Sequence, residues 1–405
     1  MVKVALFGIG GYAKGYVEAC LNKKVKNIEL VAACDPFADK SPVYEDLKSK
    51  NIAIYPEHKE LIQKHPEVDL VVISSPLALH CEQTCAALNA NMNVLCEKPM
   101  AVTIQEAKQM LEAEKSSKAT ASIGYQLNYS EAVHAIKQDL LQNAYGQVKR
   151  ISMMTQWPRG SQYYNRNTWA GQIKTPEGEW VLDSPVSNAT AHYLNLMLFL
   201  LGPSKHEAVQ PSSLTATMLR ANPITNFDTA FLKVNCPENI QLTFLTTHAI
   251  DVTLGPIMKI ECEKGHLELL EDGTIQGEKA DGSLEYYGSL ISNVTHGFKL
   301  QSLVDSITNN SEVYSPLKAS IPHIICMNAM YDSNEIMQVP QEHIQTKEVE
   351  GLGTLNIIND LKETMDEHYQ NFSIPEKVGK IQTKHGDLVD LNSIHSFPNS
   401  PKFQL

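Results

Sequence analysis

The sequence predicts a mixed α/β protein that begins with a doubly wound parallel sheet and continues into an α+β region with a large, mainly antiparallel open sheet. Two observations predict this fold class. In the first third of the chain, short apolar runs alternate with helical patterns, as in a parallel sheet that carries helices on both faces. After residue 125, β-branched runs of strand length follow one another, which is typical of antiparallel strands.

The length of the chain, 405 residues, is sufficient for two or three domains. We expect a nucleotide-binding domain over residues 1–125 and a substrate-binding α+β domain over residues 126–335. Residues 336–405 are expected to form a C-terminal extension, with one amphipathic helix over Leu355–Tyr369 and a polar tail.

The charge balance excludes one class of function. The chain has 34 Lys and Arg residues against 46 Asp and Glu residues, a formal net charge of −12, whereas binding nucleic acid without sequence preference needs basic patches that neutralise phosphates. The apolar stretch Val181–Leu201 is interrupted by polar residues, and the N-terminus lacks the long apolar region of a secretory signal. We therefore expect a cytoplasmic protein that binds neither nucleic acid nor membrane.

The cysteines predict no metal site and no disulfide framework. The eight cysteines form no CxxC pair and lie mostly inside apolar runs, which is typical of reduced, buried thiols. Cys81 and Cys85, beside His80, are the only local cluster, and they offer too few ligands for a tetrahedral site.

A glycine-rich turn follows the first apolar run. Residues 2–7 lead directly into the pattern G-x-G-x-x-A, and a helical pattern follows to about Leu21. In this context the first glycine permits a tight turn, the second lets the backbone approach a pyrophosphate, and the alanine permits close helix–strand packing. Backbone N–H groups at the helix N-terminus bind the phosphates. The expected cofactor contacts are Gly8, Ile9, Gly10, Gly11, Tyr12 and Ala13.

Asp35 predicts which dinucleotide is bound. It follows the second apolar run and lies 25 residues beyond Gly10, where a carboxylate binds a ribose 2′-hydroxyl and repels a 2′-phosphate. The predicted cofactor is therefore NAD, with NADP less favoured.

Two further apolar runs end in turn-forming residues. Leu70–Ile73 leads into Ser74-Ser75-Pro76, and Val94–Cys96 leads into Glu97-Lys98-Pro99. Because ligands of doubly wound sheets bind at the carboxyl ends of the strands, these turns are expected to face the cofactor. They add Ser75, Pro76, Glu97 and Lys98 to the predicted cofactor site.

In order and spacing these motifs resemble the Gfo/Idh/MocA oxidoreductase family, typified by glucose–fructose oxidoreductase and inositol dehydrogenase. The resemblance covers about residues 1–335 and rests on the glycine-rich turn, Asp35, Pro76 followed by His80, Glu97-Lys98-Pro99, and Gly124-Tyr125-Gln126. It implies that His80 belongs to the cofactor site and that Lys98 is catalytic and contacts both a substrate hydroxyl and the cofactor. It also implies that the proline peptide is often cis and that the protein is a homo-oligomer formed through the C-terminal sheet.

The segment Ser187–Asn195 is the predicted centre of the second domain. Helical spacing places Asn188, His192 and Asn195 on one face. The family pattern is D-x-G-x-H-x-x-D, and by resemblance His192 takes the acid/base role; an unperturbed histidine pKa near 6.5 suits proton transfer near neutral pH. Asparagine replaces both family aspartates and Thr190 replaces the glycine, so more of the acid/base work falls on His192. The alternative to an acid/base role is that His192 is a core histidine that caps or packs a helix.

A loop rich in aromatic and amide side chains, Trp157–Trp180, is typical of carbohydrate recognition, although aromatic residues also fill cores and interfaces. The predicted substrate contacts are Tyr125, Gln126, Trp169, Asn188, His192 and Asn195. Residues 126–405 carry nearly all of the excess negative charge, which favours a neutral substrate over a highly anionic one.

Together these motifs predict reversible hydride transfer between NAD and a secondary alcohol carbon of a sugar, polyol or glycoside. Two alternatives stay open. In the first, NAD stays tightly bound and is recycled in a redox-neutral sugar or glycoside conversion. In the second, loss of both aspartates leaves a catalytically weakened protein that senses or binds nucleotide.

Overall fold

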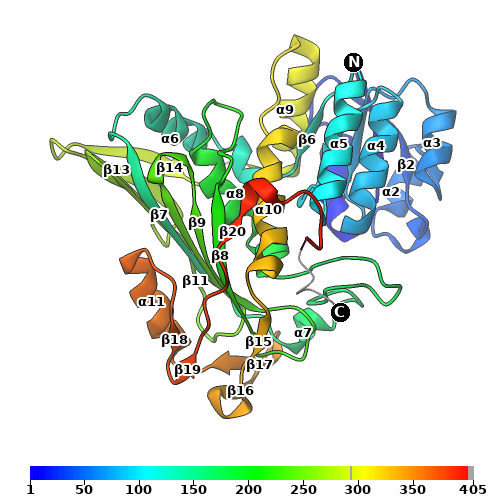
Figure 1. The fold of residues 1–405 in the computed structure, drawn as a ribbon. Coiled ribbons are helices and arrows are strands. Elements are labelled where there is room, and N and C mark those ends of the chain that lie inside the picture. Colours follow the sequence, from blue (N-terminus) through cyan, green and yellow to red (C-terminus); the bar gives the residue numbers. More distant parts are fainter. Residues whose placement is uncertain (292–293, 400–405) are drawn as a thin grey trace. The chain divides into compact units, whose positions relative to one another are not determined.

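A computed structural model describes residues 1–291 and 294–399. The chain divides into two compact units (Figure 1). Among the described residues, the first unit contains Met1–Ser130 and the segment 294–321. The second unit contains residues 131–291 and 322–399. The boundary therefore falls inside the helix α10 (Leu317–Ser333). The functions assigned to residues 1–125, 126–335 and 336–405 stay predictions.

The first unit contains the predicted parallel sheet. Six strands lie in the order β3-β2-β1-β4-β5-β6, and every neighbouring pair is parallel. The strand order reverses between β1 and β4, and this switch point is where doubly wound sheets bind their ligands. The strands are β1 (Val2–Phe7), β2 (Ile28–Cys34), β3 (Ala53–Tyr55), β4 (Leu70–Ile73), β5 (Asn93–Cys96) and β6 (Ala121–Ile123).

The connecting helices follow the predicted alternation. Figure 1 shows them against the sheet, in blue to cyan. The longest, α5, begins where Thr103 and Glu106 form a reciprocal capping box, which satisfies backbone N–H groups at the start of the helix. The helices are α1 (Lys14–Leu21), α2 (Tyr44–Ser49), α3 (His58–Lys64), α4 (His80–Asn89) and α5 (Ile104–Ser116).

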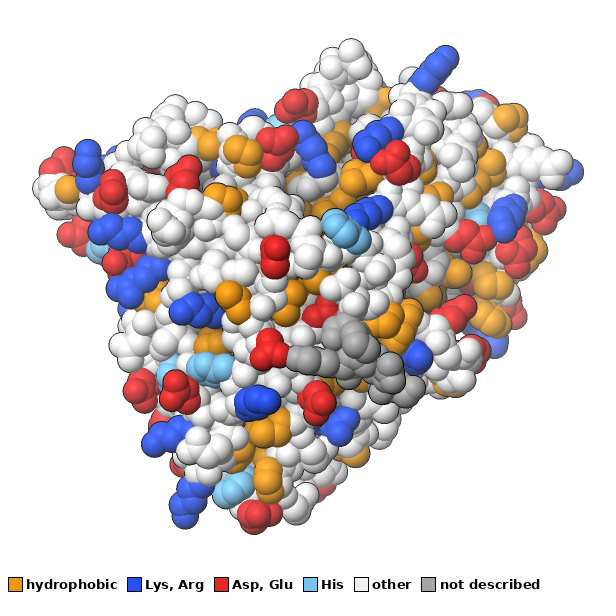
Figure 2. All heavy atoms as spheres, in the orientation of Figure 1, with side chains coloured by type: hydrophobic (Ala, Val, Ile, Leu, Met, Phe, Trp, Pro, Cys, Tyr) orange, Lys and Arg blue, Asp and Glu red, His pale blue; other side chains and the backbone are white. Residues whose placement is uncertain are grey.

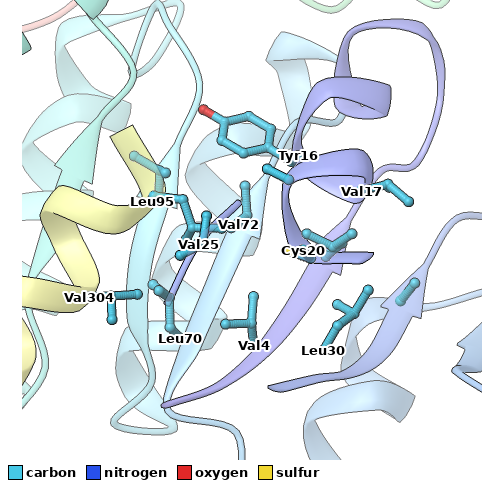
Figure 3. Packing of buried hydrophobic residues seen from close by; sticks show 14 of the residues in the cluster. Val4, Tyr16, Val17, Cys20, Val25, Leu30, Leu70, Val72, Leu95 and Val304 are labelled. Carbon is cyan, nitrogen blue, oxygen red and sulfur yellow. The ribbon is translucent and has the colours of Figure 1, made fainter. Parts of the chain in front are cut away.

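A helix from the distant part of the chain completes the first unit. The helix α9 (His296–Asn309) packs on α1, and its Leu300, Leu303 and Val304 join the buried cluster that includes Val4 and Val72 (Figure 3). The predicted domain division instead assigns this segment to the region 126–335. Its apolar spacing identifies a helix, whereas the surface that it covers is set by tertiary packing.

The second unit is built on a sheet of ten described strands in the order β14-β13-β12-β11-β7-β10-β9-β8-β15, with β20 paired to β8. Only the pairs β7–β10 and β8–β15 are parallel, so the prediction of a mainly antiparallel sheet is confirmed. The strands are β7 (Val148–Gln156), β8 (Ser213–Arg220), β9 (Thr229–Asn235), β10 (Gln241–Thr247), β11 (Leu254–Cys262), β12 (Gly265–Leu269), β13 (Thr274–Lys279), β14 (Leu284–Ser289), β15 (Ile336–Gln338) and β20 (Val389–Asp390).

Both faces of this sheet carry helices near its centre. The Thr246 hydroxyl on β10 is hydrogen-bonded to Thr190, directly before the helix α8 (Ala191–Leu200). The neighbouring Leu245 belongs to the buried cluster of Met365 on the helix α11 (Leu361–Asn371). Successive side chains of a strand point to opposite faces, so α8 begins on one face and α11 covers the other. The helix α6 (Glu131–Leu141) packs on α8.

The C-terminal extension differs from its prediction. The predicted helix over Leu355–Tyr369 is wrong in its first part. The strand β17 (Gly353–Ile358) pairs with β16 (Ile344–Val349), and α11 begins only at Leu361. Leu355 is buried between the more exposed Thr354 and Asn356, as in a strand. Asp360 has a φ of 60° at the junction, and a second hairpin, β18 (Lys377–Val378) with β19 (Ile381–Gln382), follows α11.

The charged surface side chains and the cysteines have the arrangement that the composition predicts. On the face shown in Figure 2, acidic and basic side chains are interspersed. All eight cysteines are free and buried. In residues 1–291 and 294–399, no helix combines the length and the apolar character that crossing a bilayer requires.

The packing of α11 predicts a measurable contribution to stability. Met365 is fully buried against the sheet, so Met365→Ala is expected to lower the free energy of unfolding of the second unit by about 2–5 kcal/mol. Urea unfolding followed by tryptophan fluorescence reports on this unit, because Trp157, Trp169 and Trp180 all belong to it. The control is the exposed Glu363 on the same helix, where alanine is expected to change stability by at most about 0.5 kcal/mol. Equal midpoints for the two variants would contradict the assigned packing.

Candidate active site

The glycine-rich turn adopts the conformation that its sequence predicts. Gly8 has a φ of +82°, and a Cβ atom there would lie 2.8 Å from the backbone nitrogen of Ser75, so only glycine fits between β1 and the turn after β4. A Cβ atom at Gly10 or Gly11 would meet no atom within 4 Å. The turn therefore presents an open backbone surface at the start of the helical segment (Gly11–Ala13) that leads into α1.

Asp35 is fixed against this turn by two backbone donors. The Ile9 N–H donates to Asp35 Oδ2 at 3.0 Å, and the Phe37 N–H donates to Oδ1 at 2.8 Å. The Ser41 hydroxyl donates to the Ile9 carbonyl at 2.5 Å and closes the other side of the turn. The carboxylate at the end of β2 is thus held beside the glycine-rich turn before any ligand binds.

A cavity of about 560 Å³ opens at the ends of β1, β2 and β4, within the range of small-molecule and cofactor sites. Its lining includes the predicted residues Gly8, Gly10, Gly11, Asp35, Ser75 and Pro76. It also includes Phe37, Lys40, Pro56, His58 and Leu79, which sequence analysis did not select. These five come soon after β2, β3 and β4, and position after a strand is the signal that identifies them. The open glycines, the fixed carboxylate and the apolar walls fit the adenosine end of a dinucleotide.

The remaining predicted cofactor residues are not among those that line this cavity; they are Ile9, Tyr12, Ala13, His80, Glu97 and Lys98. Ile9 and Ala13 are buried, and Tyr12 is half exposed. His80 is buried, with Nδ1 2.9 Å from the Pro99 carbonyl oxygen and Nε2 3.1 Å from the Ser75 carbonyl oxygen. Burial lowers the pKa of His80. Its ring connects the turn after β4 to the turn after β5.

The turn after β5 contains a buried charge. Glu97 is 5% exposed, and its Oε1 accepts hydrogen bonds from the Tyr16 hydroxyl and the Lys299 ammonium, both at 2.5 Å. Burial alone would raise the pKa of Glu97, but the Lys299 charge and these hydrogen bonds hold it below the usual value. The Lys98–Pro99 peptide bond that follows is cis. Sequence analysis missed Tyr16 and Lys299, since neither lies in a motif.

The segment around His192 is not one continuous α-helix. A π-helical turn covers Pro185–Ala189, Thr190 breaks the helical geometry with φ −113° and ψ 12°, and α8 then begins. The continuous helix on which the predicted common face of Asn188, His192 and Asn195 depends is not formed, because Asn188 precedes the break. The Thr190 hydroxyl donates to the Pro185 carbonyl at 2.8 Å. His192 is half-buried in the first turn of α8, and Asn195, three residues later, is fully buried.

A carboxylate still lies beside this segment. Asn188 Nδ2 donates to Asp183 Oδ1 at 2.8 Å, and the Gly171 N–H donates to Asp183 Oδ2 at 2.6 Å. Asp183 is buried, and an Arg166 guanidinium nitrogen lies 3.8 Å from its Oδ2. Asp183 is not among the predicted site residues, because it lies outside the family pattern that predicts those residues.

The aromatic loop is partly engaged by the protein itself. The Arg166 guanidinium carbon lies 3.6 Å from the Tyr163 ring centroid and 5.2 Å from that of Trp169, and Arg159 also faces Tyr163. Trp157 packs edge-on against Tyr193 of α8. Trp169 is half-buried in this loop. In the first unit, Tyr125 is buried and Gln126 is half-buried at the start of a 3₁₀ turn. The substrate-contact role of these residues stays a prediction.

The parallel sheet, glycine-rich turn and fixed Asp35 define the first unit as a dinucleotide-binding fold. A family model for the oxidoreductase family GFO_IDH_MocA, described as an NAD-binding Rossmann fold, matches residues 2–125. Residues 2–125 therefore belong to the NAD-binding Rossmann fold of the Gfo/Idh/MocA oxidoreductases. The predicted family is confirmed over these residues, and NAD is confirmed as the cofactor of this fold.

Named relatives are dehydrogenases of cyclic polyols and sugars. An inositol 2-dehydrogenase of Salmonella paratyphi B is 27% identical over 201 residues, which cover 49% of this chain and 54% of the relative. A glucose-6-phosphate 3-dehydrogenase of Bacillus subtilis is 28% identical over 153 residues, covering 38% of this chain and 42% of the relative. The matched region spans about half the length of these relatives or less.

Solved structures share the fold over more of the chain. A levoglucosan dehydrogenase in complex with NADH has a TM-score of 0.68 at 15% identity, covering 82% of this chain and 96% of that one. The WlbA dehydrogenase of Bordetella pertussis, in complex with NADH and UDP-GlcNAcA, has a TM-score of 0.67 at 19% identity and covers 82% of this chain and 95% of that one. At these identities the likeness shows the common fold.

The position of Asp35 predicts cofactor preference. Asp35→Asn keeps the side-chain shape but removes the charge, so the dissociation constant for NADH is expected to rise about tenfold or more, as one charge-assisted hydrogen bond is weakened. Affinity for NADPH relative to NADH is expected to rise, because the repulsion of a 2′-phosphate is removed. NADH and NADPH fluorescence titrations measure both changes. Asp39→Asn, at an exposed position on the same segment, is the control, and an equal effect there would contradict the assigned contact.

Proposed function

We propose that this protein is an NAD-dependent oxidoreductase that transfers a hydride between the nicotinamide and a secondary alcohol carbon of a sugar, polyol or glycoside. The observation that carries the proposal is the cavity of the first unit, where open glycines and a fixed Asp35 fit a dinucleotide. The turn with Lys98 follows β5 of the same sheet.

Lys98 and His192 have separate roles in the proposed reaction. The bound NAD supplies an acceptor for the hydride that leaves the alcohol carbon with its electron pair. The Lys98 ammonium donates a hydrogen bond to the oxygen of the reacting hydroxyl and stabilises negative charge there. The His192 imidazole accepts the hydroxyl proton, so that a carbonyl group forms as the C–H and O–H bonds break. Each group is expected to increase the rate by a factor of about 10²–10⁴, as is usual for acid–base catalysis.

The substrate class rests on relatives and on the second unit. Relatives are named for inositol and glucose 6-phosphate, and structural neighbours for levoglucosan and for aldoses. In the second unit, amide, hydroxyl and aromatic groups near the start of α8 suit hydroxyl-rich molecules, whose O–H groups pair with polar side chains.

Part of the sheet in the second unit is covered by α11, which restricts where the proposed homo-oligomer can form its interface. The helix α11 covers the sheet at β7 and β10, whereas the edge strand β14 is largely exposed, including Leu284 and Tyr286. An assembly through the sheet would therefore use the end that carries β11 to β14.

Removal of either proposed catalytic group tests the function. With NAD and a panel of inositols, aldoses and glycosides, Lys98→Ala and His192→Ala are each expected to lower kcat/KM by about 10²–10⁴ for the substrate that the wild type oxidises. NADH absorbance at saturating cofactor measures the rate, and fluorescence titration is expected to show that NADH still binds. Lys118→Ala and His266→Ala change exposed residues and serve as controls. Wild-type turnover in Lys98→Ala would contradict the proposal.

The same assays separate the two alternatives. Release of NAD on denaturation of the purified protein, with no net reduction of added NAD, indicates a recycled cofactor and a redox-neutral conversion. Tight binding of NADH with no conversion of any substrate indicates a nucleotide-binding protein.

A further inference from the structure

A buried ion pair lies behind the turn that carries Lys98. The side chains of Glu97 and Lys299 are 7% and 2% exposed, and their charged atoms are 2.5 Å apart. Charged groups are rarely buried, because removing them from water is costly even when they are paired. Because this costly pair lies next to the proposed catalytic lysine, we expect it to have a role other than stability.

The two oxygens of Glu97 serve different segments. Oε1 accepts the hydrogen bonds from Lys299 on α9 and from Tyr16 on α1. Oε2 accepts the backbone N–H of Lys98 at 3.3 Å. A Cβ atom at Gly124 would lie 2.7 Å from Oε2, so the carboxylate lies directly against the backbone that follows β6. One carboxylate thus connects two helices and two strand ends.

Lys299 is itself held in place by aromatic rings of the glycine-rich segment. Its ammonium lies 5.3 Å from the Tyr16 ring centroid and 5.6 Å from that of Tyr12. One turn earlier on α9, the His296 ring packs against both tyrosines, and a Cβ atom at Gly15 would lie 2.5 Å from it. The helix α9 therefore brings its cation to Glu97 along a fixed path beside α1.

We propose that Lys299 is a positioning residue for Lys98, acting through Glu97: it keeps the carboxylate charged and oriented, and the carboxylate in turn fixes the backbone of Lys98. This inference rests on the proposed function, in which Lys98 contacts the reacting hydroxyl. The ion pair is neutral in sum, so the turn that carries Lys98 is fixed without adding net charge beside it.

Loss of Lys299 has a definite electrostatic consequence. Burial favours the neutral carboxylic acid, and the Lys299 charge opposes it, so removing that charge raises the pKa of Glu97. In such a variant the form with ionised Glu97 is lost as pH falls through the raised pKa and returns as pH rises. The titratable groups that surround Glu97 are Tyr12, Tyr16, His80, Cys96, Lys98, Tyr129, His296 and Lys299.

The test compares kcat–pH profiles of Lys299→Met, Lys299→Arg and the wild type with the alcohol that the wild type oxidises. Lys299→Met is expected to lower kcat at pH 7 at least tenfold, to leave the KM for NAD within about twofold, and to move the acidic limb of the kcat profile up by at least one pH unit. Lys299→Arg retains the charge and is expected to keep the acidic limb near its wild-type position. Lys115→Met, at an exposed position on α5, is the control for loss of a lysine charge.

A neutral variant keeps the test decisive if Lys299→Met does not fold. The double variant Glu97→Gln with Lys299→Met leaves no buried charge, and it is expected to show reduced kcat without the shifted acidic limb. A kcat–pH profile of Lys299→Met or of the double variant that coincides with that of the wild type would overturn the inference. An equal, pH-independent loss of kcat in Lys299→Met and in the double variant would also overturn it, since a purely structural role gives that result.

Failure of the proposed function gives a different outcome. In that case the wild type oxidises no alcohol, or Lys98→Ala keeps the wild-type rate. The inference about Lys299 fails alone when Lys98→Ala loses turnover and Lys299→Met keeps both its kcat and its pH profile.

Discussion

The direction of the strands in the first unit is the constraint on which the candidate site depends. Because β1, β2, β4 and β5 are parallel, their carboxyl ends lie along one edge of the sheet. The glycine-rich turn, Asp35, the turn at Ser75 and the turn at Lys98 are separated in the sequence but follow these four strands in turn. Gly8 approaches the backbone of Ser75 too closely for any side chain, so the turn conformation and the sheet depend on each other.

Two acidic side chains, Asp35 and Glu97, lie at these carboxyl ends of the strands. Asp35 is half-buried, lines the cavity and accepts two backbone N–H groups, and in the proposed function its carboxylate binds a ribose. Glu97 is buried and needs a cation of its own, which arrives from α9, about 200 residues later in the chain. Two carboxylates at neighbouring strand ends thus have different environments, one suited to binding a ligand and the other to holding a turn.

In the second unit, hydrogen bonds hold the segment that carries His192. Asparagine stands at Asn188, yet the buried Asp183 accepts its amide hydrogen and binds the Gly171 N–H as well. The threonine that replaces a glycine breaks the helix before α8 and uses its hydroxyl to connect that break to β10. The segment that carries His192 is therefore anchored to the loop before it and to the sheet below it.

The sequence by itself determined the local features: the alternation of strands and helices in the first third, the conformation at Gly8, the position of Asp35 after β2, and the strands from β7 to β12. These follow from periodicity and from backbone restrictions that act within a few residues. Only the tertiary structure decided which distant segments meet. Apolar spacing shows that α9 and α11 are helices, but not that α9 completes the first unit or that α11 covers the second sheet. The cation for Glu97, the carboxylate beside Asn188 and the break at Thr190 come from contacts between residues far apart in sequence or from packing against the sheet, and no local pattern encodes them.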